Sequence, residues 1–141
     1  MSVIDDYREL EARCFSTAQQ LLQAGGRISR SMNQLVIDPI HFLVAVMEPG
    51  SGNPYAGVLK QAGYDYGSLR VEAQRAFNKV SSPPAVEHYT PASADMFRIA
   101  LGYARDLGSS ARLSNFQVAQ AARNAGGIAL IGYENGRGIR R

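Results

Sequence analysis

Cysteine is scarce in this chain of 141 residues, and long apolar runs are absent. Cys14 is the only cysteine, which excludes an internal disulfide. No apolar run approaches the roughly 20 residues that a membrane-spanning helix needs, and the start of the chain lacks the pattern of a secretory signal. Because 45% of the residues are hydrophobic, one compact core without metal or disulfide is expected. We therefore expect a single-domain, cytoplasmic protein that binds no membrane.

Lysine is scarce too, and the net charge is modest. The formal charge of +3 comes almost wholly from arginine, since Lys60 and Lys79 are the only lysines. The arginines are spread along the chain, apart from a short basic tail at 134–141 that we interpret as solvated. Nucleic-acid binding usually needs a basic face with interleaved aromatic residues, and the sequence shows none. We expect no nucleic-acid partner.

Motifs for catalysis, cofactors and metals are missing as well. A nucleotide-binding loop ends in Lys-Ser or Lys-Thr, whereas Gly50-Ser51-Gly52 is a glycine turn without the lysine. His41 and His88 are the only histidines, too few for a zinc site with three or four ligands. No Gly-x-Ser-x-Gly motif accompanies them. The sequence predicts no catalytic residue, no cofactor and no metal site, and leaves Cys14 acting with His41 as the alternative hypothesis.

Helical periodicity dominates the first part of the chain. Apolar residues recur at spacings of three and four over 4–23, which predicts one helix or two abutting helices. Gly25-Gly26 is expected to interrupt the helix, and the pattern resumes over 27–35. Asp38 then precedes a proline and an apolar stretch, so it should cap a buried, central helix.

The same pattern continues through the rest of the chain. A short helix is predicted over 55–62, and Ser68 should cap the next helix, which runs to about residue 79. Thr90 should cap a further helix, with proline at its first position, over 91–107.

The second half of the chain repeats the first. Leu113-Ser114 precedes an apolar helix as Ile37-Asp38 does, and laying one half on the other takes a shift of about 75 residues. The predicted fold class is therefore all-α, a pseudo-twofold helical bundle made of two repeats of short helices. Only 128–133 could form a strand, and a short helix there fits equally well. The single domain then divides into repeat one at 4–79, a linker at 80–88, repeat two at 89–133 and a basic tail at 134–141.

Several short motifs in this chain resemble a known family. They are the segments 38–43 and 58–65 in the first half, and Tyr89-Thr90-Pro91, 104–108 and 113–114 in the second. Together they are similar to the Clp N-terminal (repeat) domain of Clp-type AAA+ unfoldases, closest to the ClpB and ClpC types. The chain departs from the family pattern in two places: Phe116-Gln117 stands where a histidine-leucine pair is expected, and a Gly- and Arg-rich tail follows Gly132 in place of a closing helix. The glutamate of the Thr-Glu-His stretch in ClpC, which helps bind phosphoarginine, is also missing beside His41. Phosphoarginine recognition is therefore not expected.

The resemblance implies an all-helical, non-catalytic recognition module without cofactors. Its partners would be a Clp AAA+ ATPase, an adaptor or unfolded protein segments, bound in an exposed groove between helices. The chain would be either a motor's own N-terminal domain or a stand-alone homologue that works beside a motor. Thr90 and Pro91 also fit a purely structural role at a helix start. Carried over by position, the predicted protein-binding residues are Phe15, Ser16, Thr17, Tyr89, Thr90 and Pro91.

Two other functions stay open at this point. A self-associating structural or regulatory protein would use the repeat face as an oligomer interface, and its mass would depend on concentration without any binding to Clp partners. A small hydrolase would need a reactive Cys14, which an electrophile would label at neutral pH.

Overall fold

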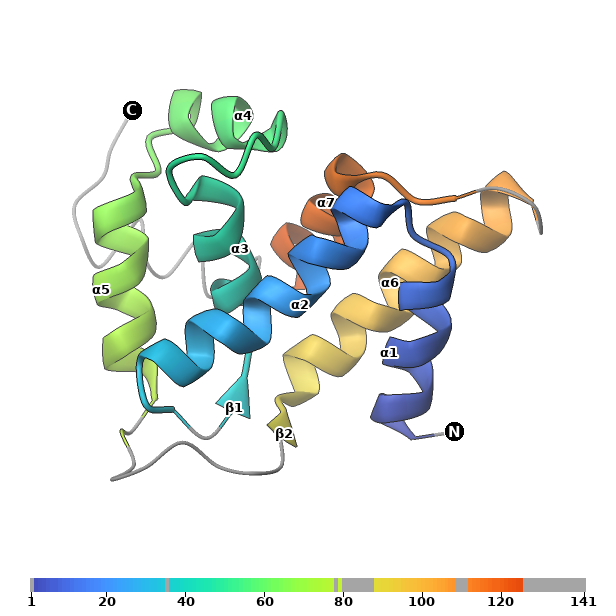
Figure 1. Cartoon of the computed structure of the whole chain (residues 1–141), viewed down its shortest axis with the longest axis horizontal. Coiled ribbons are helices and arrows are strands. Elements are labelled where there is room, and N and C mark those ends of the chain that lie inside the picture. The colour runs from blue at the N-terminus through green and yellow to red at the C-terminus, as the bar shows by residue number, and fades with distance from the viewer. Residues whose placement is uncertain (1, 35, 78, 80–87, 109–111, 126–141) are drawn as a thin grey trace.

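Helices make up most of the computed structural model, with one pair of very short strands (Figure 1). The structure describes residues 2–34, 36–77, 79, 88–108 and 112–125. The all-α fold class is confirmed. None of the described helices is both long and apolar enough to cross a membrane. The elements are α1 (Val3–Ala12), α2 (Ser16–Ser31), β1 (Val36–Ile37), α3 (Pro39–Met47), α4 (Tyr55–Gln61), α5 (Tyr66–Ala76), β2 (His88–Tyr89), α6 (Pro91–Leu107) and α7 (Asn115–Ala125).

Two parallel backbone pairings join the halves of the chain. β1 lies beside β2, and Cys14 forms an isolated parallel bridge with Leu113. The backbone N–H of Thr90 donates to the Ile37 carbonyl at 3.1 Å, and that of Phe15 donates to the Leu113 carbonyl at 3.0 Å. A shift of about 75 residues carries one pairing onto the other. The predicted pseudo-twofold relation is thus present in the backbone hydrogen bonds.

The centre of the bundle is α3, as its apolar sequence predicted. Every residue over 41–46 is buried, and α3 contacts α2, α5 and α7. Each half contributes one helix pair to this core, α2 with α3 and α6 with α7, while α1 packs against α6. Such burial on all sides explains why the α3 sequence is apolar throughout rather than on one stripe.

The predicted interruption at Gly25-Gly26 is wrong, because α2 runs through both glycines without a break. A Cβ atom on Gly25 would lie 2.5 Å from Cδ1 of the Phe42 ring and closer still to Cε1. Gly25 therefore lets α3 approach the backbone of α2, and the packing of Phe42 outweighs the weak helix propensity of glycine. The segment 4–23, predicted to form either one helix or two abutting helices, is divided between two helices, α1 and α2.

Two of the three predicted helix N-caps are present in the structure, and the third is formed by a different residue. The Asp38 carboxylate accepts from the Ile40 N–H at 3.2 Å, and the Thr90 hydroxyl accepts from the Ser93 N–H at 3.2 Å. The cap predicted at Ser68 is wrong, because Asp65 caps α5 by accepting from the Ser68 N–H at 2.9 Å. Asp65 has extended backbone angles and a stronger acceptor than a hydroxyl, so α5 begins earlier than predicted.

Three predictions concern residues near the edges of the described chain. Residues 80–87 of the predicted linker, the segment 128–133 and the basic tail at 134–141 lie outside the described residues. His88 was assigned to the linker, but it belongs to β2. The helix predicted to end at Leu107 does end there, where Gly108 adopts a φ of 108°.

Candidate protein-binding site

The start of α6 contacts the start of α3 through hydrogen bonds of polar side chains. We call this contact the Thr90 junction. The Thr90 hydroxyl donates to Asp38 Oδ1 at 2.8 Å, and the Ser93 hydroxyl donates to the Ile37 carbonyl at 2.7 Å. Burial raises the pKa of the Asp38 carboxyl above its ordinary value, although the hydrogen bonds from Thr90 and from the Ile40 N–H oppose this shift. The polar groups at this junction are therefore satisfied within the protein.

Tyr89 and Pro91 flank this junction with different exposure. The Tyr89 ring is half-buried and stacks on Tyr7 with ring centroids 5.5 Å apart, while Phe97 meets it edge-on at 5.0 Å. Pro91 is exposed at the first position of α6. Most of the Tyr89 ring is thus engaged in the core, and Pro91 alone presents an open surface here.

Replacing Thr90 by valine should destabilise the protein by about 1 to 3 kcal/mol at pH 7. The change removes the α6 cap and leaves the partly buried Asp38 carboxylate without its hydroxyl donor. Urea unfolding measures the effect. Thr17→Val is the matched control, since Thr17 is exposed and should shift stability by no more than about 0.5 kcal/mol. Equal effects of the two changes would contradict a structural role for Thr90.

The pseudo-equivalent junction at the start of α2 and α7, the Phe15 junction, is open and apolar. Phe15 is 51% exposed and Phe116 is 45% exposed, and the Phe15 side chain makes no cap to α2. Ser16 and Thr17 are exposed as well. The Phe116 ring packs edge-on against Tyr55 with centroids 5.1 Å apart. This junction exposes two aromatic side chains, whereas the Thr90 junction exposes only the ring of Pro91.

Gln117 takes the place of His41 in the second repeat. The Ser114 N–H donates to Gln117 Oε1 at 2.9 Å, just as the Asp38 N–H donates to His41 Nδ1 at 2.9 Å. A glutamine carbonyl and a neutral imidazole nitrogen both accept one hydrogen bond. The departure noted in the sequence at 116–117 therefore keeps the helix start of α7 intact.

Next to the Phe15 junction lies a groove between α6 and α7, which we call the α6–α7 groove. Its volume is about 310 Å³, and Leu107 on its rim is 53% exposed. Large apolar side chains that stay half exposed are candidates for partner contacts. The groove is lined by Tyr103, Asp106, Leu107, Phe116, Gln117 and Gln120.

The six predicted binding residues do not form one surface. Phe15, Ser16 and Thr17 lie at the start of α2 beside α7, whereas Tyr89, Thr90 and Pro91 lie at the strand pair, well apart from them (Figure 1). The sequence did not single out Leu107 and Phe116 as binding residues. The signal available for them was a large apolar residue at the last position of α6 and in the first turn of α7, positions where polar residues are common.

Cys14 and His41 are both buried, which bears on the hydrolase hypothesis. Cys14 has no exposed surface, and burial raises the pKa of its thiol to about 12. His41 also has no exposed surface, and burial lowers its pKa to about 4. Since the thiolate is the nucleophile, a neutral thiol inside the core cannot supply it near pH 7. Within the described residues no group of three or more His, Cys, Asp or Glu side chains is placed to hold a metal ion.

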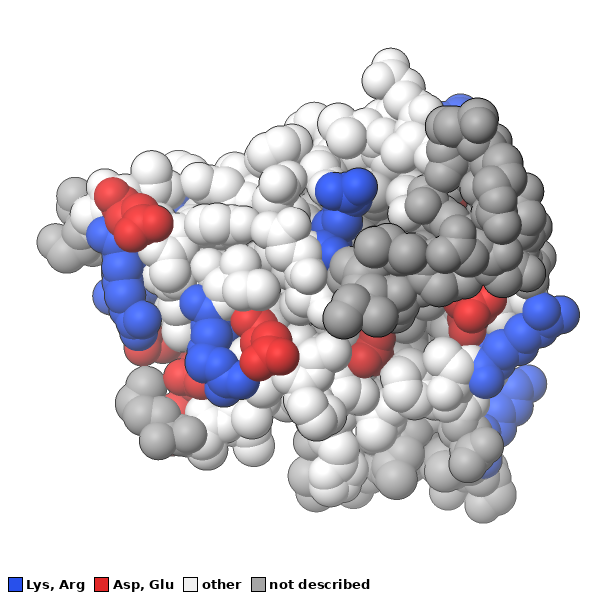
Figure 2. Space-filling model, turned by 180° about the vertical axis from the view of Figure 1, so that it is seen from behind, with Lys and Arg blue, Asp and Glu red and all other residues white. Residues whose placement is uncertain are grey.

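Charged residues are thinly spread on the face opposite to that of Figure 1. Figure 2 shows single basic groups there, several of them beside acidic ones, with wide uncharged areas between. The ion pairs of the described residues include Arg98 with Asp95 within α6, and Arg13 with Glu9 at the end of α1. On this face, recognition by charge would depend on individual groups rather than on a continuous patch.

Comparison with known proteins agrees with the helical architecture. The Clp repeat (R) N-terminal domain matches residues 15–112. Among solved structures, the N-terminal domain (1–163) of the ClpV1 ATPase from the E. coli EAEC Sci1 T6SS superposes with a TM-score of 0.62 at 15% identity, over 86% of this chain and 74% of that one. At that identity the likeness shows the fold alone. No curated protein matches.

Clp N-terminal domains occur in Clp AAA+ ATPases, where they are non-catalytic accessory domains and general interaction modules. The match to the repeat domain runs from residue 15 to residue 112, so it includes the Thr90 junction and ends before the start of α7. The specific likeness to the ClpB and ClpC types stays a prediction. This chain belongs to the family of Clp repeat (R) N-terminal domains.

Proposed function

We propose that this protein is a recognition module that docks unfolded protein segments or adaptors for a Clp AAA+ unfoldase, without catalysis of its own. The single observation that carries this proposal is the exposed apolar surface formed by Phe15, Leu107 and Phe116. At the Thr90 junction the polar side chains hydrogen-bond to one another, whereas at the Phe15 junction the exposed Phe15 side chain makes no cap. An apolar groove with a polar rim is the surface that helical domains use to hold peptide segments.

The chemistry of the α6–α7 groove fits an apolar side chain of a bound segment. Burying apolar area gives roughly 25 cal/mol per Å², and Leu107 and Phe116 are the large apolar residues available on its lining. The lining also carries the amides of Gln117 and Gln120, which can pair with the backbone of a bound segment. We propose that the whole chain acts as one such unit, with Phe15, Ser16 and Thr17 beside the groove.

Replacing Phe116 or Leu107 by alanine should weaken binding of an unfolded polypeptide about ten-fold or more. Each change removes an apolar anchor, and such anchors carry most of the binding energy in docking sites. Fluorescence anisotropy with a labelled, permanently unfolded protein measures the loss. Val58→Ala is the matched control, because Val58 is 49% exposed but lies on α4, away from the lining. Equal affinities for all three variants would reject the groove as the docking site.

Self-association is the second candidate, and the same exposed apolar residues favour it. A second copy of the chain would cover Leu107 and Phe116 as well as an unfolded segment would. Sedimentation over a range of concentrations separates the two functions. A mass that rises with concentration, falls back in the Phe116→Ala variant and comes without binding to an unfolded polypeptide or a Clp ATPase would favour the oligomer.

A further inference from the structure

A second groove lies along α2 and has a different chemistry. We call it the Arg27 groove, because Arg27 of α2 lies on its lining. It encloses about 460 Å³ between α2, the end of α3, the loop that follows α3 and the first residue of α7. This volume is within the range of roughly 300 to 1,000 Å³ that is typical of ligand sites. The apolar part of the lining consists of the buried residues Leu21 and Ala45 and the partly buried Ala24, and the buried polar residue Asn53 lies beside them.

The loop after α3 contributes two glycines, Gly50 and Gly52, to the lining of this groove. Gly50 and Gly52 have φ values of 84° and 66°, and a Cβ atom at either position would meet nothing within 4 Å. Within the described part of the chain, neither backbone N–H has a hydrogen-bond partner. Open N–H groups in a turn of this kind form a small anion-binding concavity.

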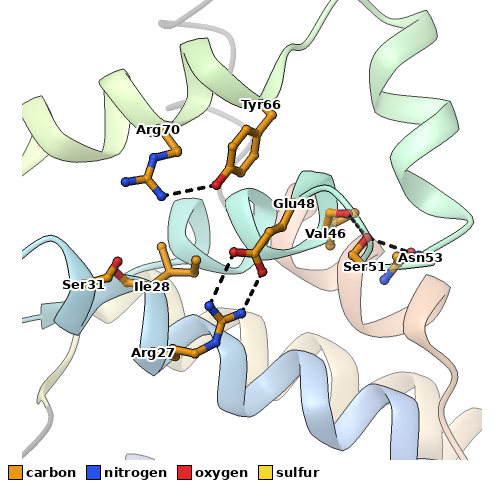
Figure 3. A network of polar contacts seen from close by, with 9 residues as sticks. All are labelled: Arg27, Ile28, Ser31, Val46, Glu48, Ser51, Asn53, Tyr66 and Arg70. Carbon is orange, nitrogen blue, oxygen red and sulfur yellow. Dashed lines mark hydrogen bonds and ion pairs between the residues drawn. The ribbon is translucent and has the colours of Figure 1, made fainter.

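The loop is held in place by its own hydrogen bonds. The Ser51 hydroxyl donates to the Val46 carbonyl at 2.6 Å and accepts from the Asn53 N–H at 3.3 Å. Figure 3 shows the contacts of Ser51 with Val46 and Asn53. The Asn53 side chain also accepts from the Tyr55 N–H at 2.9 Å, so the loop is bonded to both α3 and α4. The loop that carries the two free donors is therefore anchored by hydrogen bonds at both of its ends.

Arg27 supplies the positive charge. Its Nη2 lies 2.7 Å from Glu48 Oε1 and its Nη1 lies 3.4 Å from Oε2 (Figure 3). The Arg27 side chain is 56% exposed, and that of Glu48 is 29% exposed. The hydrogen bond with Glu48 raises the pKa of Arg27, so the guanidinium stays charged. A guanidinium carries more N–H donors than the two that Glu48 engages, and Arg27 and Glu48 are the only charged residues on the lining.

We propose that the Arg27 groove binds the free C-terminal carboxylate of a protein segment. The carboxylate would accept from Arg27 and from the N–H groups of Gly50 and Gly52, a combination that backbone turns use to capture chain ends. The last side chain of the segment would rest on the apolar lining at Leu21, Ala24 and Ala45. This site goes beyond the proposed function, because it selects a chain end rather than an internal apolar segment.

Glu48 opposes the binding of a carboxylate, whereas Arg27 favours it. It shares the guanidinium with the incoming carboxylate and repels it, so Glu48→Gln should tighten binding. Arg27→Gln removes the only positive charge on the lining and should weaken binding about ten-fold. A cationic ligand would give the reverse order, since it would be held by Glu48. The two variants therefore report the charge of the ligand directly.

The test uses two fluorescein-labelled peptides of the same sequence that end in leucine, one with a free carboxylate and one with a C-terminal amide. Anisotropy should show the free acid binding about ten-fold more tightly than the amide. Arg27→Gln should abolish this preference and Glu48→Gln should enlarge it. In a two-dimensional NMR titration, the free acid should shift the amide signals of Gly50 and Gly52 and the amidated peptide should not.

Equal binding of both peptides would overturn the proposal, as would weaker binding in Glu48→Gln. The Phe116→Ala variant separates this site from the proposed function. It should lose the unfolded polypeptide and keep the preference for the free acid, because Phe116 is not on the lining of the Arg27 groove. Circular dichroism of each variant shows that the helices are intact. The NMR titration of the unaltered protein keeps the test decisive if a variant misfolds.

Discussion

Gly25→Ala is expected to lower the free energy of unfolding by about 1 to 3 kcal/mol. The new Cβ would lie 2.5 Å from Phe42 Cδ1 and 2.9 Å from Cζ. Phe42 has no exposed surface and packs edge-on against Phe97 with centroids 6.3 Å apart, so its ring has no free space to move into. The cost of overpacking exceeds the gain of about 1 kcal/mol that alanine brings in a helix. Urea denaturation followed by circular dichroism measures the difference.

The matched control for this prediction is Gly102→Ala in α6. Gly102 also lies inside a helix, but a Cβ atom there would meet nothing within 4 Å. We expect this change to raise stability by up to about 1 kcal/mol. Adding Phe42→Leu to Gly25→Ala should recover part of the loss, because the smaller side chain relieves the contact. If both alanine variants were equally stabilised, the close approach of α3 to α2 would be wrong.

Stability should also fall by about 3 kcal/mol as the pH is lowered from 6.5 to 4, because of His41. Burial lowers the pKa of His41 to about 4 from an ordinary 6.5. Between these values the unfolded chain binds a proton that the folded protein does not, and each pKa unit corresponds to about 1.4 kcal/mol. The contribution is fully present above the unfolded pKa and is lost as the pH falls toward the folded one. Urea unfolding at a series of pH values measures the slope.

The neutral His41 ring is built into a chain of buried hydrogen bonds. Its Nδ1 accepts from the Asp38 N–H at 2.9 Å, so Nε2 carries the proton and donates to Gln34 Oε1 at 2.6 Å. Gln34 in turn donates to the Ala73 carbonyl of α5 at 2.8 Å. A protonated ring would lose the bond at Nδ1, which links the start of α3 to this chain.

His41→Gln isolates the contribution of this residue. Glutamine keeps an acceptor for the Asp38 N–H, as Gln117 does for Ser114 in the second repeat, but it does not titrate. The variant should therefore fold and lose most of the acid slope between pH 6.5 and 4. Asp38 acts in the opposite sense near the lower limit, since its raised pKa favours the folded state on acidification, and it is present in both proteins. An unchanged slope in the variant would assign the acid sensitivity to other groups.

The helices could be predicted from the sequence because their signals are local. Asp38 and Thr90 each precede a proline, and both cap the helices that were expected. The break predicted at Gly25 was wrong because this glycine is required by a tertiary contact, the close approach of Phe42 from a different helix. The strands of residues 36–37 and 88–89 were too short for any periodicity and exist only because the two halves meet.

The candidate site was predictable only in part. Phe15 was selected through the resemblance, and its exposed position fits that choice. Thr90 was selected in the same way, but its hydroxyl is engaged with Asp38. Leu107 and Phe116 read as core residues in a periodic pattern, since exposure depends on what the rest of the chain covers. The Arg27 groove combines α2 with a loop and could not be assembled from sequence spacing.

The bridge between Cys14 and Leu113 affects how the chain is completed during translation. The N-cap residue of α2, Phe15, makes no side-chain cap, and among the described residues its backbone N–H is paired by the Leu113 carbonyl. A growing chain leaves this group unpaired until Leu113 has left the ribosome, so the pairing forms only after much of the second repeat has been made. In that interval a neighbouring nascent copy can offer its own Leu113. Crowded synthesis, as on a polysome, should therefore yield dimers with exchanged halves.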